Sequence, residues 1–402
     1  MRKVKKDIKI LIFFLAAVVL AGIFSYFIFY YNAFLNIAPQ PADAKISING
    51  YPYASGKIKL MPGQYQIKIE KEGFVPLERK LKLKRGDNLS IILTLKQVPQ
   101  AILLSDKKIS QLIADTERKN FYYLSGKTIY KATLTEDEKN PLQILPITSE
   151  IEGLQSVLFS PNFQLAIFRK QNNESGIFDF KRYDLLHQEY TSMGKDIGNV
   201  VWQTDGEKIF YFYAPADGER SLIRASKNNS DVERIYDCRE TGLQNPILKI
   251  SSDGTKILFL EKDIYLFDIY KRTLDKLSDS GKIVDAVFSP NMDKILYATD
   301  SKDPLIPYQA QISIMDIQGK NNKNLDLRTN LDKTVWLADN LNIIADSKEG
   351  LAKVNTDSLA KIAFVYQNNF KAENLILSKD EKVLYFLSEG NFYSIVLQTK
   401  EY

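Results

Sequence analysis

The fold is decided by residues 250–260, which read ISSDGTKILFL. An apolar strand end at Ile250 leads into the polar turn 251–255, and a run of apolar residues follows Lys256. Asp-Gly is a strong turn signal, because aspartate hydrogen-bonds its own backbone and glycine adopts a positive φ at no steric cost. The stretch therefore predicts two adjacent antiparallel strands joined by a tight turn.

The same pattern returns throughout residues 100–402. Anchored on its acidic or amide turn residue, it occurs at intervals of 38 to 48 residues, at Glu117, Asn162, Asp205, Asp253, Asn291, Asp339 and Asp380. A third apolar segment and a short fourth one follow, as at 263–269 and 274–277. Four short strands with a period of about 40–50 residues are typical of β-propeller blades. The pattern predicts a propeller over residues 98–402 with seven blades. Six or eight blades remain open, because the first and sixth copies match less well.

A propeller has to close its ring. The last unit has three predicted strands before Tyr402, whereas residues 101–104 precede the first unit and belong to none. A closed ring removes exposed sheet edges. We therefore expect residues 101–104 to supply the outer strand of the last blade.

A smaller domain is predicted before the propeller, over residues 41–97. Apolar and polar residues alternate in 65–70, 80–84 and 89–95, which indicates strands with one buried face. Asn49-Gly50 and Pro62-Gly63 mark tight turns between such segments. These features predict an all-β module of about 60 residues, a small antiparallel β-sandwich.

Three stretches of this module resemble the PEGA domain. They read PADAKISING at 41–50, LMPGQYQIKI at 60–69 and KEGF at 71–74, and Ala54-Ser55-Gly56 departs from the family's usual pattern. The resemblance implies a small β-sandwich of bacterial and archaeal envelope proteins with a spacer or interaction role. It carries over no catalytic residue.

The repeats also resemble a known family. FSPN occurs at 159–162 and 288–291, beside SSDGTK at 251–256, and these stretches are similar to the repeats of TolB-like and WD-repeat-like propellers. The resemblance implies that the turn residues are structural. It transfers a fold without a substrate.

The N-terminal segment predicts a membrane anchor. Residues 10–31 contain no charge, and residues 1–9 contain five basic residues and one acid. A helix of this length covers about 30 Å of hydrocarbon. We expect a cytoplasmic stub at 1–9, an uncleaved transmembrane signal anchor at 10–31, a linker at 32–40, and the remaining chain outside the cytoplasm. A cleaved signal peptide is the alternative.

The overall charge argues against a nucleic-acid partner. The chain has 54 basic and 49 acidic residues and a net charge of +5. Five of the basic residues lie in the N-terminal stub, so the remainder is close to neutral.

The residues predict no catalytic, cofactor-binding or metal-binding site. The single histidine, His187, cannot build a His-Glu-x-x-His zinc site, and no Gly-x-Ser-x-Gly is present. We expect His187 at the surface and the single cysteine, Cys238, in the core. Gly126-Lys127-Thr128 resembles the end of a phosphate loop, but a strand follows where a helix is required, so a hairpin turn is predicted.

The sequence therefore favours a membrane-anchored extracytoplasmic binding or scaffold protein over an enzyme. Its expected partners are the membrane and either an envelope protein or a cell-wall polymer. The alternative is a propeller-type hydrolase or lyase acting on envelope polysaccharide, which needs a carboxylate pair in the channel. A purely structural surface-layer role is a third hypothesis. The irregular connections 213–221 and 300–311 are candidate partner-binding loops.

Overall fold

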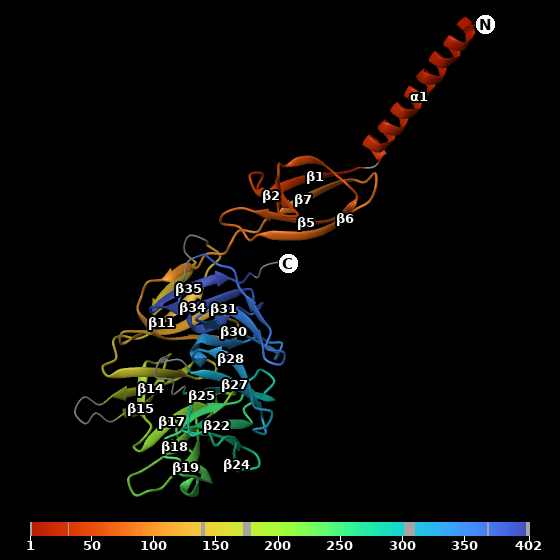
Figure 1. Ribbon diagram of the computed structural model, residues 1–402. Helices are drawn as coiled ribbons and strands as arrows, with labels where there is room; N and C mark the ends of the chain where they lie inside the picture. The colour runs from red at the N-terminus through yellow and green to blue at the C-terminus, as the bar shows by residue number, and fades with distance from the viewer. Residues whose placement is uncertain are drawn as a thin grey trace. The chain divides into compact units, whose positions relative to one another are not determined.

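The computed structural model describes residues 2–30, 32–137, 141–171, 178–300, 310–367 and 370–398. The chain divides into two compact units, which we describe separately. The first comprises Met1–Pro99, Val365–Gln367 and Gln398–Tyr402, and the second comprises Gln100–Phe364 and Asn368–Leu397. The described residues contain one α-helix, and the other long elements are strands (Figure 1). The predicted all-β class is confirmed.

The helix, α1 (Arg2–Tyr30), covers the segment predicted to be helical. Its described side chains, those of residues 12–26, are mostly apolar and exposed, with Phe13 at 78%. Measured over the described residues, none of the helices combines the length and the apolarity needed to cross a membrane. The predicted transmembrane span at 10–31 is not supported by the structure.

The rest of the first unit contains a two-layer β-sandwich. One sheet has the order β4-β1-β7 and the other has the order β3-β2-β5-β6. The strands are β1 (Ala33–Gln40), β2 (Lys45–Ile48), β3 (Tyr51–Tyr53), β4 (Gly56–Leu60), β5 (Gly63–Glu70), β6 (Leu77–Leu83) and β7 (Asn88–Thr94). Ile46 and Ile48 of β2 and Ile67 and Ile69 of β5 are buried in the core that the two sheets share. These buried residues are the apolar members of the apolar–polar alternation in the sequence.

The predicted linker at 32–40 was wrong. This segment forms β1, which lies in the centre of its sheet, antiparallel to β4 and parallel to β7. Ala33, Leu35 and Ile37 are 0% exposed. The stretch Ala38-Pro39-Gln40-Pro41 suggested a stiff spacer, because proline-rich segments are extended and semi-rigid. The antiparallel pairing with β4 ends at Ile37, however, so Pro39 lies beyond the part of the strand that is paired on both sides.

The second unit consists of four-stranded sheets, which we number as blades along the chain. Blade 1 contains β9 (Ile109–Ala114), β10 (Asn120–Ser125), β11 (Thr128–Leu134) and β12 (Leu142–Pro146). Blade 2 contains β13 (Leu154–Phe159), β14 (Leu165–Gln171), β15 (Phe178–Asp184) and β16 (Glu189–Ser192). Blade 3 contains β17 (Ile197–Trp202), β18 (Lys208–Tyr213), β19 (Ser221–Ser226) and β20 (Glu233–Asp237). Blade 4 contains β21 (Ile247–Ile250), β22 (Lys256–Leu260), β23 (Ile264–Asp268) and β24 (Thr273–Lys276).

The remaining blades complete the ring. Blade 5 contains β25 (Ile283–Phe288), β26 (Lys294–Thr299), β27 (Gln311–Asp316) and β28 (Lys323–Arg328). Blade 6 contains β29 (Thr334–Trp336), β30 (Asn342–Ser347), β31 (Gly350–Asn355) and β32 (Lys361–Ala363). Blade 7 contains β33 (Glu373–Leu377), β34 (Val383–Ser388), β35 (Asn391–Val396) and, as its outer strand, β8 (Ile102–Ser105). Within the described residues this confirms seven units and the predicted closing strand.

Each blade buries both of its faces against its neighbours. In β22, Ile257 and Phe259 pack in a core shared with blade 3, whereas Leu258 and Leu260 pack in a core shared with blade 5. Cores of the same kind join blades 7 and 1, 1 and 2, 2 and 3, and 5 and 6. Strands buried on both faces read as continuous apolar runs. The apolar run after each turn in the sequence has this cause.

The seven strand 1–2 turns share one backbone conformation. The residue after each predicted turn position has a φ between 55° and 74°, at Arg118, Phe163, Gly206, Gly254, Met292, Asn340 and Glu381. This left-handed region costs an L-residue about 1 kcal/mol. Five of the seven residues are not glycine, so the turn geometry requires the conformation whatever the side chain.

Several of these left-handed residues contact the turn or strand of the preceding blade. The ring of Phe163 stacks on Tyr122 of blade 1 with 4.2 Å between centroids. At Gly254, an added Cβ would lie 2.6 Å from the Thr204 Oγ1 of blade 3, so a side chain there would have to displace the threonine hydroxyl. The turns therefore join neighbouring blades as well as strands.

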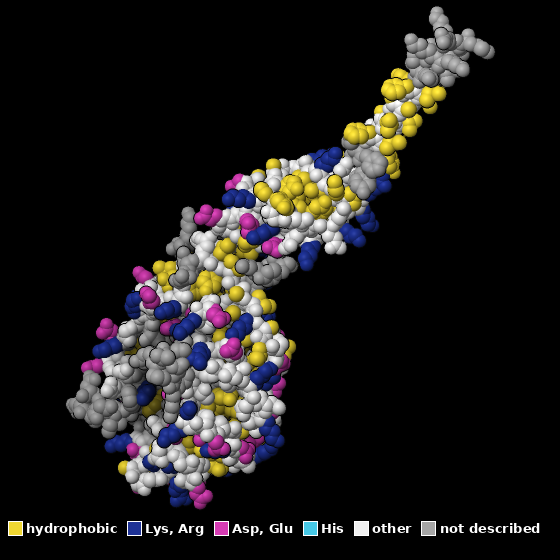
Figure 2. Space-filling model, in the orientation of Figure 1, with side chains coloured by type: hydrophobic (Ala, Val, Ile, Leu, Met, Phe, Trp, Pro, Cys, Tyr) yellow, Lys and Arg dark blue, Asp and Glu magenta, His cyan; other side chains and the backbone are white. Residues whose placement is uncertain are grey.

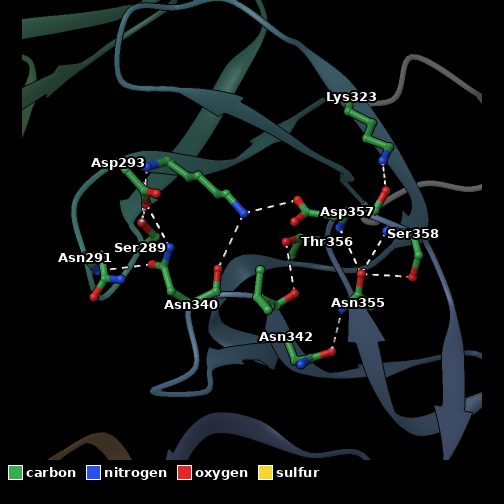
Figure 3. Close-up of polar contacts among 12 residues, drawn as sticks. Ser289, Asn291, Asp293, Lys323, Asn340, Asn342, Asn355, Thr356, Asp357 and Ser358 are labelled. Atoms are coloured by element: carbon green, nitrogen blue, oxygen red, sulfur yellow. Dashed lines mark hydrogen bonds and ion pairs between the residues drawn. The ribbon is translucent and has the colours of Figure 1, made fainter.

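Asn340 makes the most extensive contact of this kind (Figure 3). Its side chain is 5% exposed and comes from blade 6. The Asn340 Oδ1 accepts the backbone N–H of Asn291 at 3.0 Å, and the Nδ2 donates to the Asp293 Oδ1 at 2.9 Å. Burial tends to raise the pKa of Asp293, but bonds from Asn340 and Ser289 outweigh it and lower the pKa. The Nζ of Lys294 lies 3.1 Å from the Asp357 Oδ1 and extends the network.

We expect Asn340→Ala to destabilise the propeller by about 3 kcal/mol, because two buried hydrogen bonds are lost and alanine disfavours the left-handed region. Thermal unfolding should shift down by about 6–12 °C. The matched control is Asn291→Ala, whose exposed side chain makes no hydrogen bond to any described residue and whose backbone N–H is retained. Equal losses in both variants, measured by calorimetry, would contradict the assigned role of the Asn340 side chain.

Candidate functional site

The acidic turn residue that opened the sequence pattern is structural. The Asp253 Oδ1 accepts the Ser251 hydroxyl at 2.5 Å and the Thr255 N–H at 3.0 Å, and Oδ2 accepts the Thr255 hydroxyl at 2.8 Å. Burial raises the pKa of Asp253, but these bonds outweigh it and lower the pKa. Both oxygens are engaged within the turn, which leaves Asp253 poorly suited to act on a ligand.

In two copies of the pattern, the carboxylate that accepts the hydrogen bonds of the turn comes from a different position. In blade 1 Asp115, rather than Glu117, accepts the N–H groups of Lys119 and Asn120. In blade 5 Asp293, rather than Asn291, accepts the Ser289 hydroxyl at 2.9 Å. The sequence pattern located the turn correctly in both blades. The residue whose carboxylate accepts the hydrogen bonds of the turn was predicted wrongly.

Charged side chains link the first strands around the ring centre. These strands are innermost, because first strands of neighbouring blades contact each other, as β29 contacts β33 and β33 contacts β9. The Lys249 Nζ of β21 lies 2.5 Å from the Asp285 Oδ1 of β25. The Lys333 Nζ of the 3₁₀-helix η2 (Leu331–Lys333) lies 3.1 Å from the Glu373 Oε1 of β33. Acidic residues are thus gathered here, as a propeller enzyme would require.

Two carboxyls of this cluster have raised pKa values. Burial and then the charge of Glu373 raise the pKa of Asp332, with a smaller contribution from Asp285. Burial also raises the pKa of Asp346, whose Oδ2 accepts the Ala372 N–H at 2.8 Å. We name Asp285, Asp332, Asp346 and Glu373 the carboxylate cluster. Among the described residues, no group of three or more His, Cys, Asp or Glu side chains is arranged to hold a metal ion.

A groove of about 560 Å³ lies between blades 2 and 3. Blade 2 contributes the turn 162–165, Arg182 and the turn 184–187, and blade 3 contributes Lys227 and Asn228. The turns follow the first or third strand of a blade, and Arg182 lies near the end of the third strand β15, so these residues lie at the same end of the ring. The volume falls within the range of about 300–1,000 Å³ that small-molecule sites occupy. We call this the blade 2–3 groove.

Arg182 is the notable side chain of the groove. Its Nη2 donates to the Thr191 Oγ1 at 2.9 Å. Its Nε is buried without a hydrogen-bond partner among the described residues. A buried donor without an acceptor costs about 1–3 kcal/mol.

The single histidine also lies in the groove. The Asp184 Oδ1 accepts the N–H groups of Leu186 at 2.9 Å and His187 at 3.0 Å, and Oδ2 lies 3.1 Å from the His187 Nδ1. The backbone N–H of His187 is the largest cause of the lowered pKa of Asp184. The Asp184 side chain in turn raises the pKa of His187. The contact with His187 thus offsets the negative charge of Asp184, the acid that lines the groove.

The other residues singled out from the sequence have structural places. Cys238 is 0% exposed in the core of blades 3 and 4, and burial raises the pKa of its thiol to about 12. His187 is exposed, as predicted. Gly126 and Lys127 form the hairpin turn between β10 and β11. In the loop 213–221, Arg220 donates to the Pro215 carbonyl at 3.0 Å. Residues 301–309 of the other candidate loop lie outside the described residues.

The sequence did not reveal the blade 2–3 groove. Arg182 and Lys227 lie on strands or turns of ordinary composition, and no short motif joins them. The signal that was present is the single histidine beside Asp184, which taken alone predicted an ordinary surface residue.

Comparisons with known proteins are consistent with both parts of this architecture. Residues 33–99 match the PEGA domain model, a stretch that begins with β1. An oligogalacturonate lyase in complex with manganese shares 14% identity and a TM-score of 0.51 over 74% of this chain and 93% of the other. The oligogalacturonate lyase of Vibrio parahaemolyticus shares 12% identity and a TM-score of 0.50 over 74% and 90%. Residues 33–99 are thus similar to the PEGA domain, and the chain has a fold shared with known propellers.

Other comparisons add less. TolB from Acinetobacter baumannii shares 19% identity, with a TM-score of 0.41 over 65% of this chain. The match spans 59% of that TolB chain. A search of curated proteins gave no significant match. Identities at this level show a shared fold and assign no substrate.

The Asp184–His187 pair has a measurable consequence. The Asp184 side chain raises the folded pKa of His187, and the backbone N–H of His187 is the main cause of the lowered folded pKa of Asp184, so the charged form of each group stabilises the folded state. The His187 contribution is present below the pKa of a free imidazole and is lost as the pH rises through the folded pKa. The Asp184 contribution is lost as the pH falls through its own lowered pKa.

We expect an NMR titration of the single histidine to give a pKa above that of a free imidazole. Asp184→Asn should bring it back towards the free value, because the amide keeps the shape but loses the charge. Asp179→Asn, on the same strand, is the control and should leave the titration unchanged. An unshifted wild-type midpoint would contradict the pairing.

Proposed function

We propose that this protein is a binding or scaffold protein of the cell envelope, in which the propeller presents a binding face to an envelope protein or cell-wall polymer. The observation that carries the proposal is the blade 2–3 groove, about 560 Å³ in volume and lined by Arg182, His187 and Lys227. Its walls are turns held by their own hydrogen bonds, so the side chains are positioned before a ligand arrives. Preorganised polar groups on rigid turns suit recognition.

The composition of the surface supports a binding role. On the visible face of the propeller, basic and acidic side chains are interspersed, and hydrophobic side chains gather on the sandwich unit (Figure 2). Exposed apolar residues of the sandwich include Tyr51 at 72%, Met61 at 67% and Ile92 at 66%. The PEGA match favours an extracellular setting for this unit.

The proposal includes attachment to a membrane through the N-terminal segment. Its support is the uncharged stretch 10–31 in the sequence and the exposure of apolar side chains on α1, such as Phe24 at 69%. The full chain should sediment with membranes and resist extraction by high salt or carbonate. A variant that begins at Asn32 should remain in the supernatant. Release of the full chain by salt alone would refute the attachment.

A second candidate function is a hydrolase or lyase acting on envelope polysaccharide. The observation that favours it is the carboxylate cluster, in which Asp332 has a raised pKa beside the charges of Glu373 and Asp285. A general acid needs a pKa raised in this direction. The ion pair between Lys333 and Glu373 favours a structural role for the same groups.

We expect the immobilised full-length protein to retain a protein or glycan from an envelope extract of the source cells. Arg182→Gln together with Lys227→Gln should reduce retention about tenfold or more, because charge-assisted hydrogen bonds are lost. The control Lys181→Gln removes a charge from the same strand on its opposite face. Turnover of envelope polysaccharide that Asp332→Asn abolishes, with nothing retained, would establish the enzyme instead.

A further inference from the structure

The side chains that line the blade 2–3 groove restrict the class of ligand that it can bind. An inference about this ligand rests on the binding function proposed above. Its lining combines one guanidinium, one ammonium and one imidazole with the side-chain amides of Asn162, Gln164 and Asn228. The groove also contains Leu186, whose side chain is 80% exposed. Charge, amides and an apolar contact are thus present together in one hollow.

Basic side chains outnumber acidic ones in the lining of the groove. Asp184 is the only acid among the described residues that line it, and its oxygens accept the bonds from Leu186 and His187 described above. Lys227 pairs with Glu207 at 2.9 Å at the margin of the groove. Among the described residues, no carboxylate lies within ion-pair distance of Arg182. The uncompensated charge in the groove is therefore that of Arg182.

The guanidinium of Arg182 defines what can bind. Its Nη2 donates to Thr191, and its Nε is buried within the protein without an acceptor among the described residues. A ligand in the groove therefore meets the accessible part of the guanidinium, which binds the oxygens of a carboxylate or phosphate by charge-assisted hydrogen bonds.

The amides add a second requirement. A primary amide offers a donor and an acceptor, which are the complements of a hydroxyl group. The Asn162 Oδ1 accepts the Ser160 hydroxyl and the Gln164 N–H within the turn, so Gln164 and Asn228 are the amides that the groove offers to a ligand. A peptide ligand would also need apolar pockets for its side chains. Among the apolar residues of the lining, Leu186 is exposed, whereas Phe163, Leu165 and Leu185 are partly buried.

We infer that the blade 2–3 groove binds an anionic sugar, with the oxyanion on the Arg182 guanidinium, the hydroxyls on the amides of Gln164 and Asn228, and an apolar ring face on Leu186. Carboxylate and phosphate substituents share the required chemistry. Repeated anionic sugar units would make a polymer a multivalent ligand for such a site.

The test uses the full-length protein and the ring resonance of His187 as the reporter. Glucuronate and glucose 6-phosphate are titrated separately, with glucose, acetate and a glutamate-containing tripeptide as comparisons. A saturable shift is expected with at least one charged sugar, and the affinity for that sugar should exceed the affinities for glucose, acetate and the peptide at least fivefold. Tighter binding of glucuronate indicates a carboxylate ligand, and tighter binding of glucose 6-phosphate indicates a phosphate ligand. No shift with either sugar, or equal or tighter binding of glucose, acetate or the peptide, would overturn the assignment.

Variants separate direct binding from folding. Arg182→Gln should weaken binding of the charged sugar about tenfold or more, whereas Lys181→Gln should change it less than twofold. If Arg182→Gln lowers the melting temperature, the exposed Lys227→Gln replaces it, with an expected loss of about threefold. Unchanged affinity in the folded variant refutes the inference. Envelope material that is retained without any sugar-induced shift refutes the sugar assignment and leaves the binding function standing. Sugar binding without retention of envelope material supports the sugar assignment and refutes the proposed binding of an envelope component.

Discussion

The burial of both faces of every blade is the constraint on which the propeller depends. A four-stranded sheet with two apolar faces has no stable exposed form, and each face finds its cover only in the next blade. In blade 4 this is seen at β22, where successive side chains pack into two different cores. Such packing continues until the last blade meets the first. Blade 7 is completed by β8, which pairs Leu103 with Tyr393. Closure thus joins residues from opposite ends of the propeller sequence, and non-local pairing of this kind slows folding.

The parts of this fold that could be predicted from the sequence are those determined by local interactions. A turn such as that at Asp253 satisfies its own hydrogen bonds, so its residues specify it without help from elsewhere. The alternation in β5 likewise reports one buried face, and its core residues were predictable from spacing alone. Residues 32–40 were mistaken for a linker, because Pro39 and Pro41 are typical of a stiff spacer. Only the register with β4 and β7 shows that the missing N–H of Pro39 is tolerated.

The groove and the carboxylate cluster depend on which blades are adjacent and in what register, and that information is not local. Arg182 and Lys227 belong to different blades, and the distance between their strands follows from core packing at residues such as Ile167 and Ile223. Asp332 and Asp285 likewise influence each other only because the first strands converge on the ring centre. The sequence therefore predicted the fold class and closure of the ring, but it predicted neither group of charged residues.

The left-handed position of the strand 1–2 turn shows where the copies became different from one another. All seven copies keep the positive φ, and five of them accept the steric cost of a side chain there. Glycine occurs at Gly254, where a Cβ would displace the Thr204 hydroxyl, and at Gly206, where a Cβ would lie 3.5 Å from Pro161. In three other copies the side chain connects blades: Phe163 stacks on Tyr122, Asn340 binds the turn of blade 5, and Glu381 accepts the Ala338 N–H at 2.5 Å. Phe163 also lines the blade 2–3 groove. A position that the repeat holds constant in backbone conformation is therefore free to vary in chemistry, and in blade 2 this variation contributes directly to the candidate binding site.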